Sequence, residues 1–156
     1  MQIDAPDLPT LGIVLAKKIG DHTYYSLSRR LIMNGDLNAT GRLFGGKLMA
    51  WIDEAAALFC MAQMGTRQIV TKKISEVIFN EPADLGDVLE FLFRVKQGGR
   101  TSLTVECQVV TKMIGDTDRK KLIVECDVVF VAIGKDGRPV PHRYSVERVT
   151  ASDFEF

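Results

Sequence analysis

Several features that mark particular classes of protein are scarce in this 156-residue sequence. It contains only three cysteines (Cys60, Cys107 and Cys126) and two histidines (His22 and His142). An odd number of widely spaced cysteines argues against a disulfide framework and favours a reducing compartment. No Cys/His spacing typical of a zinc site is present. We therefore expect a cytoplasmic protein that has no metal site.

An excess of charge of one sign and a long apolar run are also lacking. The 20 Lys and Arg residues balance the 20 Asp and Glu residues, so the chain has no field that would attract nucleic acid or an anionic membrane. No apolar run approaches the roughly 20 residues of a membrane-spanning helix. The first residues lack the basic and then apolar pattern of a signal peptide. We therefore expect neither nucleic acid nor membrane as a partner.

The composition is that of a globular protein, with 46 % hydrophobic and 26 % charged residues. Residues 1–20 form a loose lead-in, Thr23–Ile32 predicts a strand, and Gly45–Met64 predicts one long helix that ends at Gly65. Strand patterns joined by short turns follow at Gln68–Phe79, Val88–Val95, Thr101–Met113 and Lys121–Ile133. Short turns favour antiparallel neighbours, and the helix is apolar all round. The prediction is an α+β fold whose antiparallel sheet wraps around one long central helix.

Two glycines open the predicted helix, and the preceding residues almost match a nucleotide-binding P-loop. Gly41, Gly46 and Lys47 fit that pattern, but Leu48 stands where a Ser or Thr should bind magnesium, and a polar loop replaces the buried strand. We therefore reject the P-loop. The glycine pair can expose backbone N–H groups to an anion or oxyanion, or it can allow close packing against a strand.

Asp53 is the candidate catalytic residue on this helix. A helical wheel groups Asp53 with Ala50, Ala56 and Cys60, and places Trp51 and Glu54 on the opposite side. A carboxylate among small and apolar side chains needs a hydrogen-bond partner, a cavity or an interface. From the wheel alone, a structural bond to a neighbouring strand explains its position more readily than catalysis does, since ion networks also place carboxylates inward. Glu54 is expected to face solvent, and Cys60 is expected to lie in the core.

The motif around the helix start resembles that of the hot-dog-fold acyl-CoA thioesterases, the YciA-like group. The family pattern N-x-x-G-x-x-F-G-G-x-L-x-x-x-x-D is matched from Asn38 to Asp53. Weaker matches follow in order, at Ile69–Thr71, Phe79–Asp87, Gly99–Ser102 and Phe130–Pro141. The resemblance implies the hot-dog fold over residues 23–141, with a lead-in at 1–22 and a tail at 142–156.

The resemblance also implies an activity and its residues. The expected reaction is hydrolysis of an acyl-CoA to the free acid and CoA. CoA is part of the substrate, and no further cofactor is expected. Asp53 would act as general base or nucleophile, and Asn38 would position water or thioester from the facing subunit. Two backbone N–H groups would form the oxyanion hole, those of Gly45 and Gly46.

The substrate's CoA portion is expected near the turn between two predicted strands. The residues concerned are Gly99, Arg100, Thr101 and Ser102. As a sequence pattern, a plain hairpin turn explains this segment equally well. The resemblance implies a homodimer or a higher even oligomer with sites between subunits. Two rival functions remain at this point, a hot-dog hydratase or dehydratase and a non-catalytic acyl-CoA-binding module.

Overall fold

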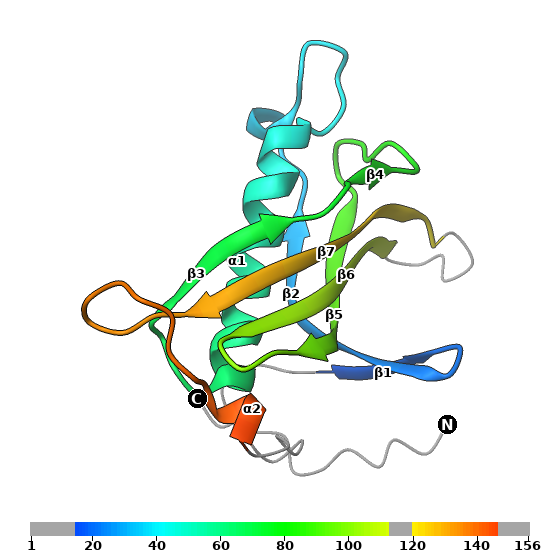
Figure 1. Cartoon of the computed structure of the whole chain (residues 1–156). Coiled ribbons are helices and arrows are strands. Elements are labelled where there is room, and N and C mark those ends of the chain that lie inside the picture. The colour runs from blue at the N-terminus through cyan, green and yellow to red at the C-terminus, as the bar shows by residue number, and fades with distance from the viewer. Residues whose placement is uncertain (1–14, 113–119, 147–156) are drawn as a thin grey trace.

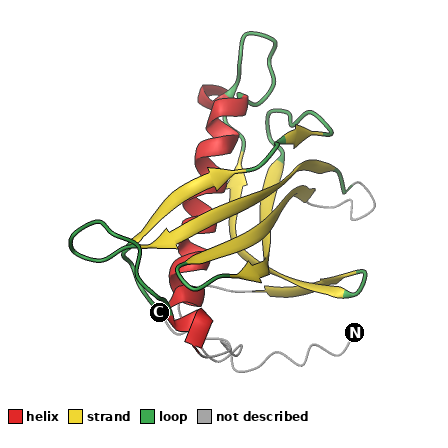
Figure 2. Ribbon diagram, viewed as in Figure 1, coloured by secondary structure: helices red, strands yellow, loops and turns green. Residues whose placement is uncertain are grey.

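The computed structural model describes residues 15–112 and 120–146, and one long helix runs along a strongly curved sheet. Figure 1 shows the helix α1 (Gly45–Met64) lengthwise against the strands, and Figure 2 separates helix from sheet by colour. The strands are β1 (Leu15–Ile19), β2 (His22–Leu31), β3 (Ile69–Ile74), β4 (Ile78–Phe79), β5 (Val88–Gly98), β6 (Ser102–Lys112) and β7 (Leu122–Ala132). Two short helical segments complete the fold, η1 (Asn34–Asp36) and α2 (Arg143–Val146).

All neighbouring strands are antiparallel, in the order β1-β2-β5-β6-β7-β3. The short β4 pairs with the first part of β7, and β3 pairs with its last part. The α+β prediction is therefore confirmed, and the helix occupies the predicted residues. It ends because Gly65 adopts a left-handed conformation with φ of 65°, which a residue with a side chain rarely adopts.

The core lies between α1 and the concave face of the sheet. Phe59 of α1 stacks on Phe93 of β5 with ring centroids 5.6 Å apart, and Cys60 is fully buried beside it. On β6 every second residue is fully buried in this core, namely Leu103, Val105, Cys107 and Val109. Burial raises the pKa of the Cys60 thiol, so Cys60 is an unreactive core residue.

Three details of the strands differ from the sequence prediction. The strand β1 lies inside the predicted lead-in, and its residues pair with β2. The predicted strand at 68–79 is interrupted at Ser75, whose hydroxyl accepts a hydrogen bond from the backbone of Asp127 at 2.7 Å. The strand β5 continues through Lys96 to Gly98, because its backbone pairs with β6 beyond the predicted end. The domain boundaries at residues 22 and 141 stay predictions.

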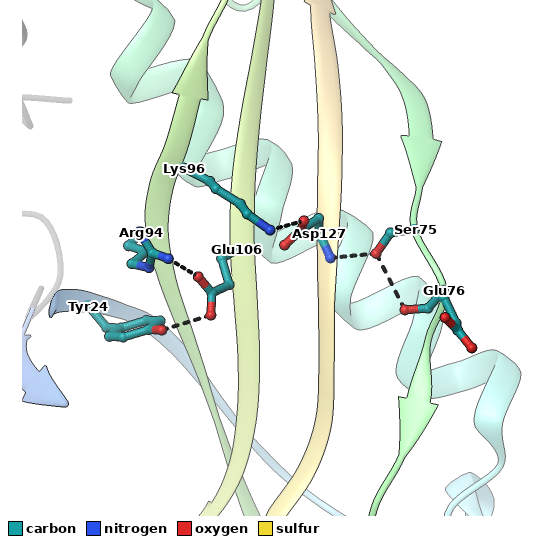
Figure 3. A network of polar contacts seen from close by, with 7 residues as sticks. All are labelled: Tyr24, Ser75, Glu76, Arg94, Lys96, Glu106 and Asp127. Carbon is teal, nitrogen blue, oxygen red and sulfur yellow. Dashed lines mark hydrogen bonds and ion pairs between the residues drawn. The ribbon is translucent and has the colours of Figure 1, made fainter. Parts of the chain in front are cut away.

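The outer face of the sheet carries charged side chains that neutralise one another. Figure 3 shows the carboxylate of Glu106 between Arg94 and the hydroxyl of Tyr24, which donates at 2.9 Å, while Lys96 reaches Asp127. The guanidinium of Arg94 lies 5.8 Å from the centre of the Tyr24 ring. Neutralised in this way, the charges of this face tolerate partial burial.

Glu90 of β5 anchors the first two strands. Its side chain is only 1 % exposed, and its carboxylate bonds to Lys17 of β1 at 2.5 Å and Arg29 of β2 at 3.4 Å. Burial by itself raises the pKa of Glu90, but the hydrogen bonds from Lys17 and Ser26 and the charges of Lys17 and Arg29 outweigh it. The pKa therefore lies below its ordinary value.

We expect Glu90→Gln to lower the free energy of unfolding by about 1–3 kcal/mol at pH 7, since a hydrogen-bonded charge is lost. A folded-state pKa below the unfolded value stabilises the protein at higher pH, and this stabilisation is lost as the pH falls through the folded-state pKa. The difference between wild type and variant should therefore shrink below about pH 4, as chemical denaturation at several pH values would measure. The exposed Glu125→Gln is the control, and a difference that stays constant with pH would contradict the assignment.

Candidate active site

The helix α1 begins with two backbone N–H groups that point out of the helix. The N-terminal cap is Phe44, whose carbonyl accepts hydrogen bonds from the N–H groups of Lys47 and Leu48. Among the described residues, the N–H groups of Gly45 and Gly46 have no hydrogen-bond partner. Together with the positive end of the helix dipole, they can hold an anion or an oxyanion.

The glycines also allow close packing, so both interpretations of the pair have support. A Cβ at position 45 would lie 3.3 Å from the ring of Phe79, and one at position 46 would lie 2.8 Å from the ring of Phe44. Lys47, the residue that a P-loop would use for phosphate, instead bonds to Asp36 at 2.7 Å and to the carbonyl of Gly35. Its hydrogen bond lowers the pKa of Asp36.

Asn38 lies in the loop that leads into the helix, and its side chain closes that loop. Its Oδ1 accepts hydrogen bonds from the backbone N–H of Thr40 at 2.9 Å, from the Thr40 hydroxyl at 2.7 Å and from the N–H of Arg42 at 3.2 Å. Two of these donors are backbone N–H groups, which fixes which amide atom is the oxygen. The Nδ2 group of Asn38 therefore remains as the donor available to a ligand.

Gly41 permits this loop to turn. Its φ of 77° lies in the left-handed region, and its N–H donates to the carbonyl of Asn38 at 3.0 Å. A residue with a Cβ would be strained in this conformation. The signature glycine therefore serves the loop that holds Asn38.

Asp53 lies two turns further along α1, half-buried beside the edge strand β3. Its Oδ1 accepts a hydrogen bond from the hydroxyl of Thr71 at 2.7 Å. The neighbouring Glu54 is exposed and pairs with Arg30 at 2.9 Å, as expected for a solvent-facing residue. Asp53 thus has one side-chain partner among the described residues and remains open to the surface.

The helical wheel predicted the surroundings of α1 only in part, because Cys60 is buried and Glu54 is exposed as expected, but two residues depart from the grouping. Trp51 is buried, with the guanidinium of Arg30 5.1 Å from the centre of its ring, whereas Ala50 is exposed. The wheel correctly separates Asp53 from Trp51, but periodicity alone does not tell which face the sheet covers. The uncovered stripe of the helix comprises Gly46, Lys47, Ala50, Asp53, Glu54, Ala57, Leu58 and Met61, of which Asp53, Ala57 and Met61 are half-buried.

The predicted CoA-binding turn lies at the other end of the helix. Gly99 donates its N–H to the carbonyl of Ser102 at 2.9 Å, and the carbonyl of Thr101 accepts from Ala132 at 2.9 Å. The buried His142 contacts the carbonyl of Ser102 through its ring atom Nε2 at 2.8 Å, and the backbone N–H of His142 donates to the carbonyl of Arg100. Figure 1 shows that the β5–β6 turn and α2 lie near the C-terminal end of α1. The side chain of Arg100 is exposed.

A cleft of about 310 Å³ lies beside the start of α1. Its lining includes Asn38, the helix residue Leu48, and Ile123 of β7. The segment from Phe79 to Ala83 forms another of its walls. We predicted no cleft here from the sequence, because the residues that line it come from separate parts of the chain and meet only in the fold.

One protomer does not bring all the predicted residues together. Eight residues separate Gly45 from Asp53, which corresponds to about 12 Å along the helix axis. Asn38 and the glycine N–H groups lie near the helix start, Asp53 lies midway, and the β5–β6 turn lies at the far end. Sequence reasoning also missed Thr71, whose only signal was a hydroxyl on an edge strand.

Residues 15–112 and 120–146 lack two further kinds of feature. Within these ranges, no group of three or more His, Cys, Asp or Glu side chains is arranged to hold a metal ion. No helix in these ranges has both the length and the apolar character needed to cross a membrane.

Comparison with known proteins defines the class to which this fold and helix start belong. Residues 40–116 match the family model of the thioesterase superfamily, and the chain belongs to that family. The acyl-CoA thioester hydrolase YciA of Salmonella typhimurium is 30 % identical over 115 residues, which cover 72 % of this chain and 86 % of YciA. The predicted family and the hot-dog fold are therefore confirmed.

Solved structures of thioesterases are similar to this chain in both sequence and fold. An apo-hexameric acyl-CoA thioesterase is 36 % identical, with a TM-score of 0.69 and coverage of 74 % of this chain and 72 % of that one. The acyl-CoA hydrolase of Staphylococcus aureus, solved with butyryl-CoA, CoA and CoA disulfide, is 31 % identical, with a TM-score of 0.69 and coverage of 76 % and 70 %. Alanine variants of that enzyme replace an asparagine and an aspartate fifteen residues apart, the separation of Asn38 and Asp53 here.

We expect Asn38→Ala to destabilise the protein by about 1–2 kcal/mol, because three hydrogen bonds of the loop are lost. Asn38→Asp keeps the acceptor oxygen and should retain most of this stability while removing the Nδ2 donor. Thermal unfolding and hydrogen exchange of residues 38–42 would measure both effects. Equal destabilisation by the two substitutions would contradict the role given to Oδ1.

Proposed function

We propose that this protein hydrolyses acyl-CoA thioesters to the free carboxylic acid and CoA. One observation carries the proposal: the carboxylate of Asp53 is open to the surface on the same helix whose first two N–H groups have no hydrogen-bond partner among the described residues. The relatives named above support the substrate class, because they are acyl-CoA thioester hydrolases.

The active site is proposed to be shared between two protomers. A thioester carbonyl must lie about 3 Å from its oxyanion donors and its carbon about 3–3.5 Å from the attacking atom. The roughly 12 Å between Gly45 and Asp53 along one helix is too long for this. A second copy that packs against the open stripe of α1 would bring its own helix start to Asp53. The apolar Leu58 and Met61 of that stripe would be covered by the same contact.

The chemistry needs a base or nucleophile and donors for the oxyanion. As a base, the carboxylate of Asp53 would take a proton from water while the oxygen of that water attacks the carbonyl carbon of the thioester. The N–H groups of Gly45 and Gly46 would stabilise the negative charge on the former carbonyl oxygen. Collapse of this intermediate breaks the C–S bond, and the proton passes to the leaving thiolate of CoA. As a nucleophile, Asp53 would instead form an anhydride that water hydrolyses.

Asn38 and Thr71 have supporting roles in this proposal. The free Nδ2 group of Asn38 would donate a hydrogen bond to the thioester or to the attacking water. Thr71 bonds to Oδ1 of Asp53 and leaves Oδ2 to face the substrate. Because the Asn38 loop is held by its own hydrogen bonds, its donor would be fixed in position before substrate binds.

The β5–β6 turn is proposed to contact the CoA portion of the substrate. Arg100 offers an exposed guanidinium, and Thr101 and Ser102 offer hydroxyl groups beside it. The contacts of His142 with Ser102 and Arg100 would hold the turn in place, while the bond between Gly99 and Ser102 keeps it tight. CoA enters as part of the substrate, and no further cofactor is proposed.

An even-numbered oligomer in the cytoplasm completes the proposal. Because the site needs two protomers, a dimer is the smallest active unit, and a hexamer would satisfy the same condition. The hexameric thioesterase similar to this chain supports an assembly of that kind. The three cysteines are free and buried, which agrees with a reducing compartment.

A hydratase or dehydratase is disfavoured by the positions of both histidines. His22 is exposed at the start of β2, and His142 is bound to the β5–β6 turn. Neither lies beside Asp53 along the chain or in the strand next to it. A module that binds acyl-CoA without hydrolysing it remains a distinct outcome of the assay below.

We expect Asp53→Asn to lower kcat by at least about 100-fold, as the loss of a general base does. Thiol release from acyl-CoA, followed with a thiol-reactive dye, would measure the rate. The matched control is Glu54→Gln, the adjacent carboxylate on the same helix, which should change kcat by less than about twofold because its ion pair with Arg30 is exposed.

Two outcomes would contradict the proposal. A wild-type protein that is thermally stabilised by acyl-CoA but releases no thiol would be a binding module. Equal losses of activity in Asp53→Asn and Glu54→Gln would remove Asp53 from the reaction.

Mixing two inactive variants tests whether the site is shared. We expect co-expressed Asn38→Asp and Asp53→Asn chains to regain about a quarter of the wild-type sites. Half of randomly formed dimers are mixed, and each mixed dimer holds one intact site of two. The specific activity of the whole co-expressed preparation, purified through one tag common to both chains, would measure the recovery. Activity no greater than that of either variant alone would place Asn38 and Asp53 in one protomer.

A further inference from the structure

The cleft beside the start of α1 has a closed floor and an open rim. Leu48 and Ile123, which form part of its floor, are each only 1 % exposed and belong to the core. The rim is polar, with the exposed Arg42, Asn80 and Glu81 around the mouth. A ligand arm that enters this cleft past its rim therefore meets the core at Leu48 and Ile123.

The cleft adjoins the proposed reaction centre through two of its lining residues. Asn38, whose free amide donor is proposed to contact the thioester, forms part of its wall. Phe79 lines the cleft and also packs against Gly45, where a Cβ would lie 3.3 Å from its ring. If the N–H groups of Gly45 and Gly46 hold the oxygen of the thioester, one of the two chains attached to the thioester group, acyl or pantetheine, would lie beside Phe79.

The two arms of an acyl-CoA differ in chemistry and in what must follow them. The pantetheine arm is polar and leads to a charged nucleotide, so it must leave through an opening to solvent. The acyl arm is apolar and has a free end. A closed apolar floor formed by Leu48 and Ile123, with Leu43 and Ala83 beside it, suits the acyl arm.

We propose that this cleft binds the acyl chain and that its floor limits the length of chain accepted. Its volume of about 310 Å³ is at the lower end of the roughly 300–1,000 Å³ found for small-molecule sites, so it holds one arm of the substrate and not the whole of CoA. The substrate class is an acyl-CoA with an apolar acyl chain of short to medium length. This proposal rests on the proposed function.

Ala83 and Phe79 allow the cleft to be changed in opposite directions. Ala83 is buried in the wall, so Ala83→Leu places three additional carbon atoms in the cleft. Phe79 is 53 % exposed, so Phe79→Ala widens the cleft with little disturbance of the core. Leu85 lies outside the cleft lining and is 52 % exposed, which makes Leu85→Ala the matched control.

The measurement is kcat/KM for straight-chain acyl-CoAs from acetyl- to dodecanoyl-CoA, compared as the ratio of octanoyl-CoA to butyryl-CoA. Ala83→Leu should lower this ratio at least about tenfold, because one methylene group in an apolar pocket already changes kcat/KM by about 10–200-fold. Phe79→Ala should raise it severalfold, and Leu85→Ala should leave it within about twofold of wild type.

The outcomes separate this proposal from the one on which it rests. Absence of hydrolysis of every acyl-CoA by wild-type protein would overturn the proposed function. Wild-type hydrolysis with an unchanged ratio in both cleft variants would overturn the acyl site alone. If Ala83→Leu fails to fold, the exposed Phe79→Ala decides by itself, since a ratio equal to that of Leu85→Ala would overturn the acyl site.

Discussion

The structure depends on covering one long apolar helix with a single sheet. A sheet that curves around α1 buries Trp51, Ile52 and Phe59, but it reaches only part of the way around the helix circumference. The remaining stripe carries alanines, Leu58 and Met61 together with a half-buried carboxylate. Incomplete coverage thus leaves Asp53 accessible and at the same time leaves apolar area that a second copy would bury. The fold and the proposed site share one cause.

The charges of the protein are organised differently on the two sides of the sheet. On the outer face each buried carboxylate has a cation beside it, as Glu90 has Lys17 and Glu106 has Arg94. Such pairs stabilise a carboxylate in a region of low dielectric constant, but the cation also neutralises the charge of the carboxylate. Asp53 is held instead by the neutral hydroxyl of Thr71. A carboxylate oriented by a neutral donor keeps its negative charge uncompensated, as an attacking group or base requires.

Local sequence signals predicted the elements well and their surroundings poorly. The helix bounds were correct because helix formers, the glycines at its start and Gly65 at its end act within one segment. The wheel did not show that Trp51 is buried, since the cation that lies over this ring, Arg30, comes from β2. The strand β1 was missed because a short edge strand among prolines and glycines has little pattern of its own. Motif resemblance pointed to Asn38 and Asp53, whereas Thr71 and the cleft required the fold.

Asn38 shows how folding and chemistry can depend on one side chain. Its oxygen closes the loop through Thr40 and Arg42, and its nitrogen is the donor that the proposed reaction uses. Glutamine would carry the same amide one carbon further out and disturb the turn, and serine would lack the second polar atom. Evolution and protein design therefore have little freedom at this position. A redesign of the reaction would need to rebuild the whole Leu37–Leu43 connection before changing its donor.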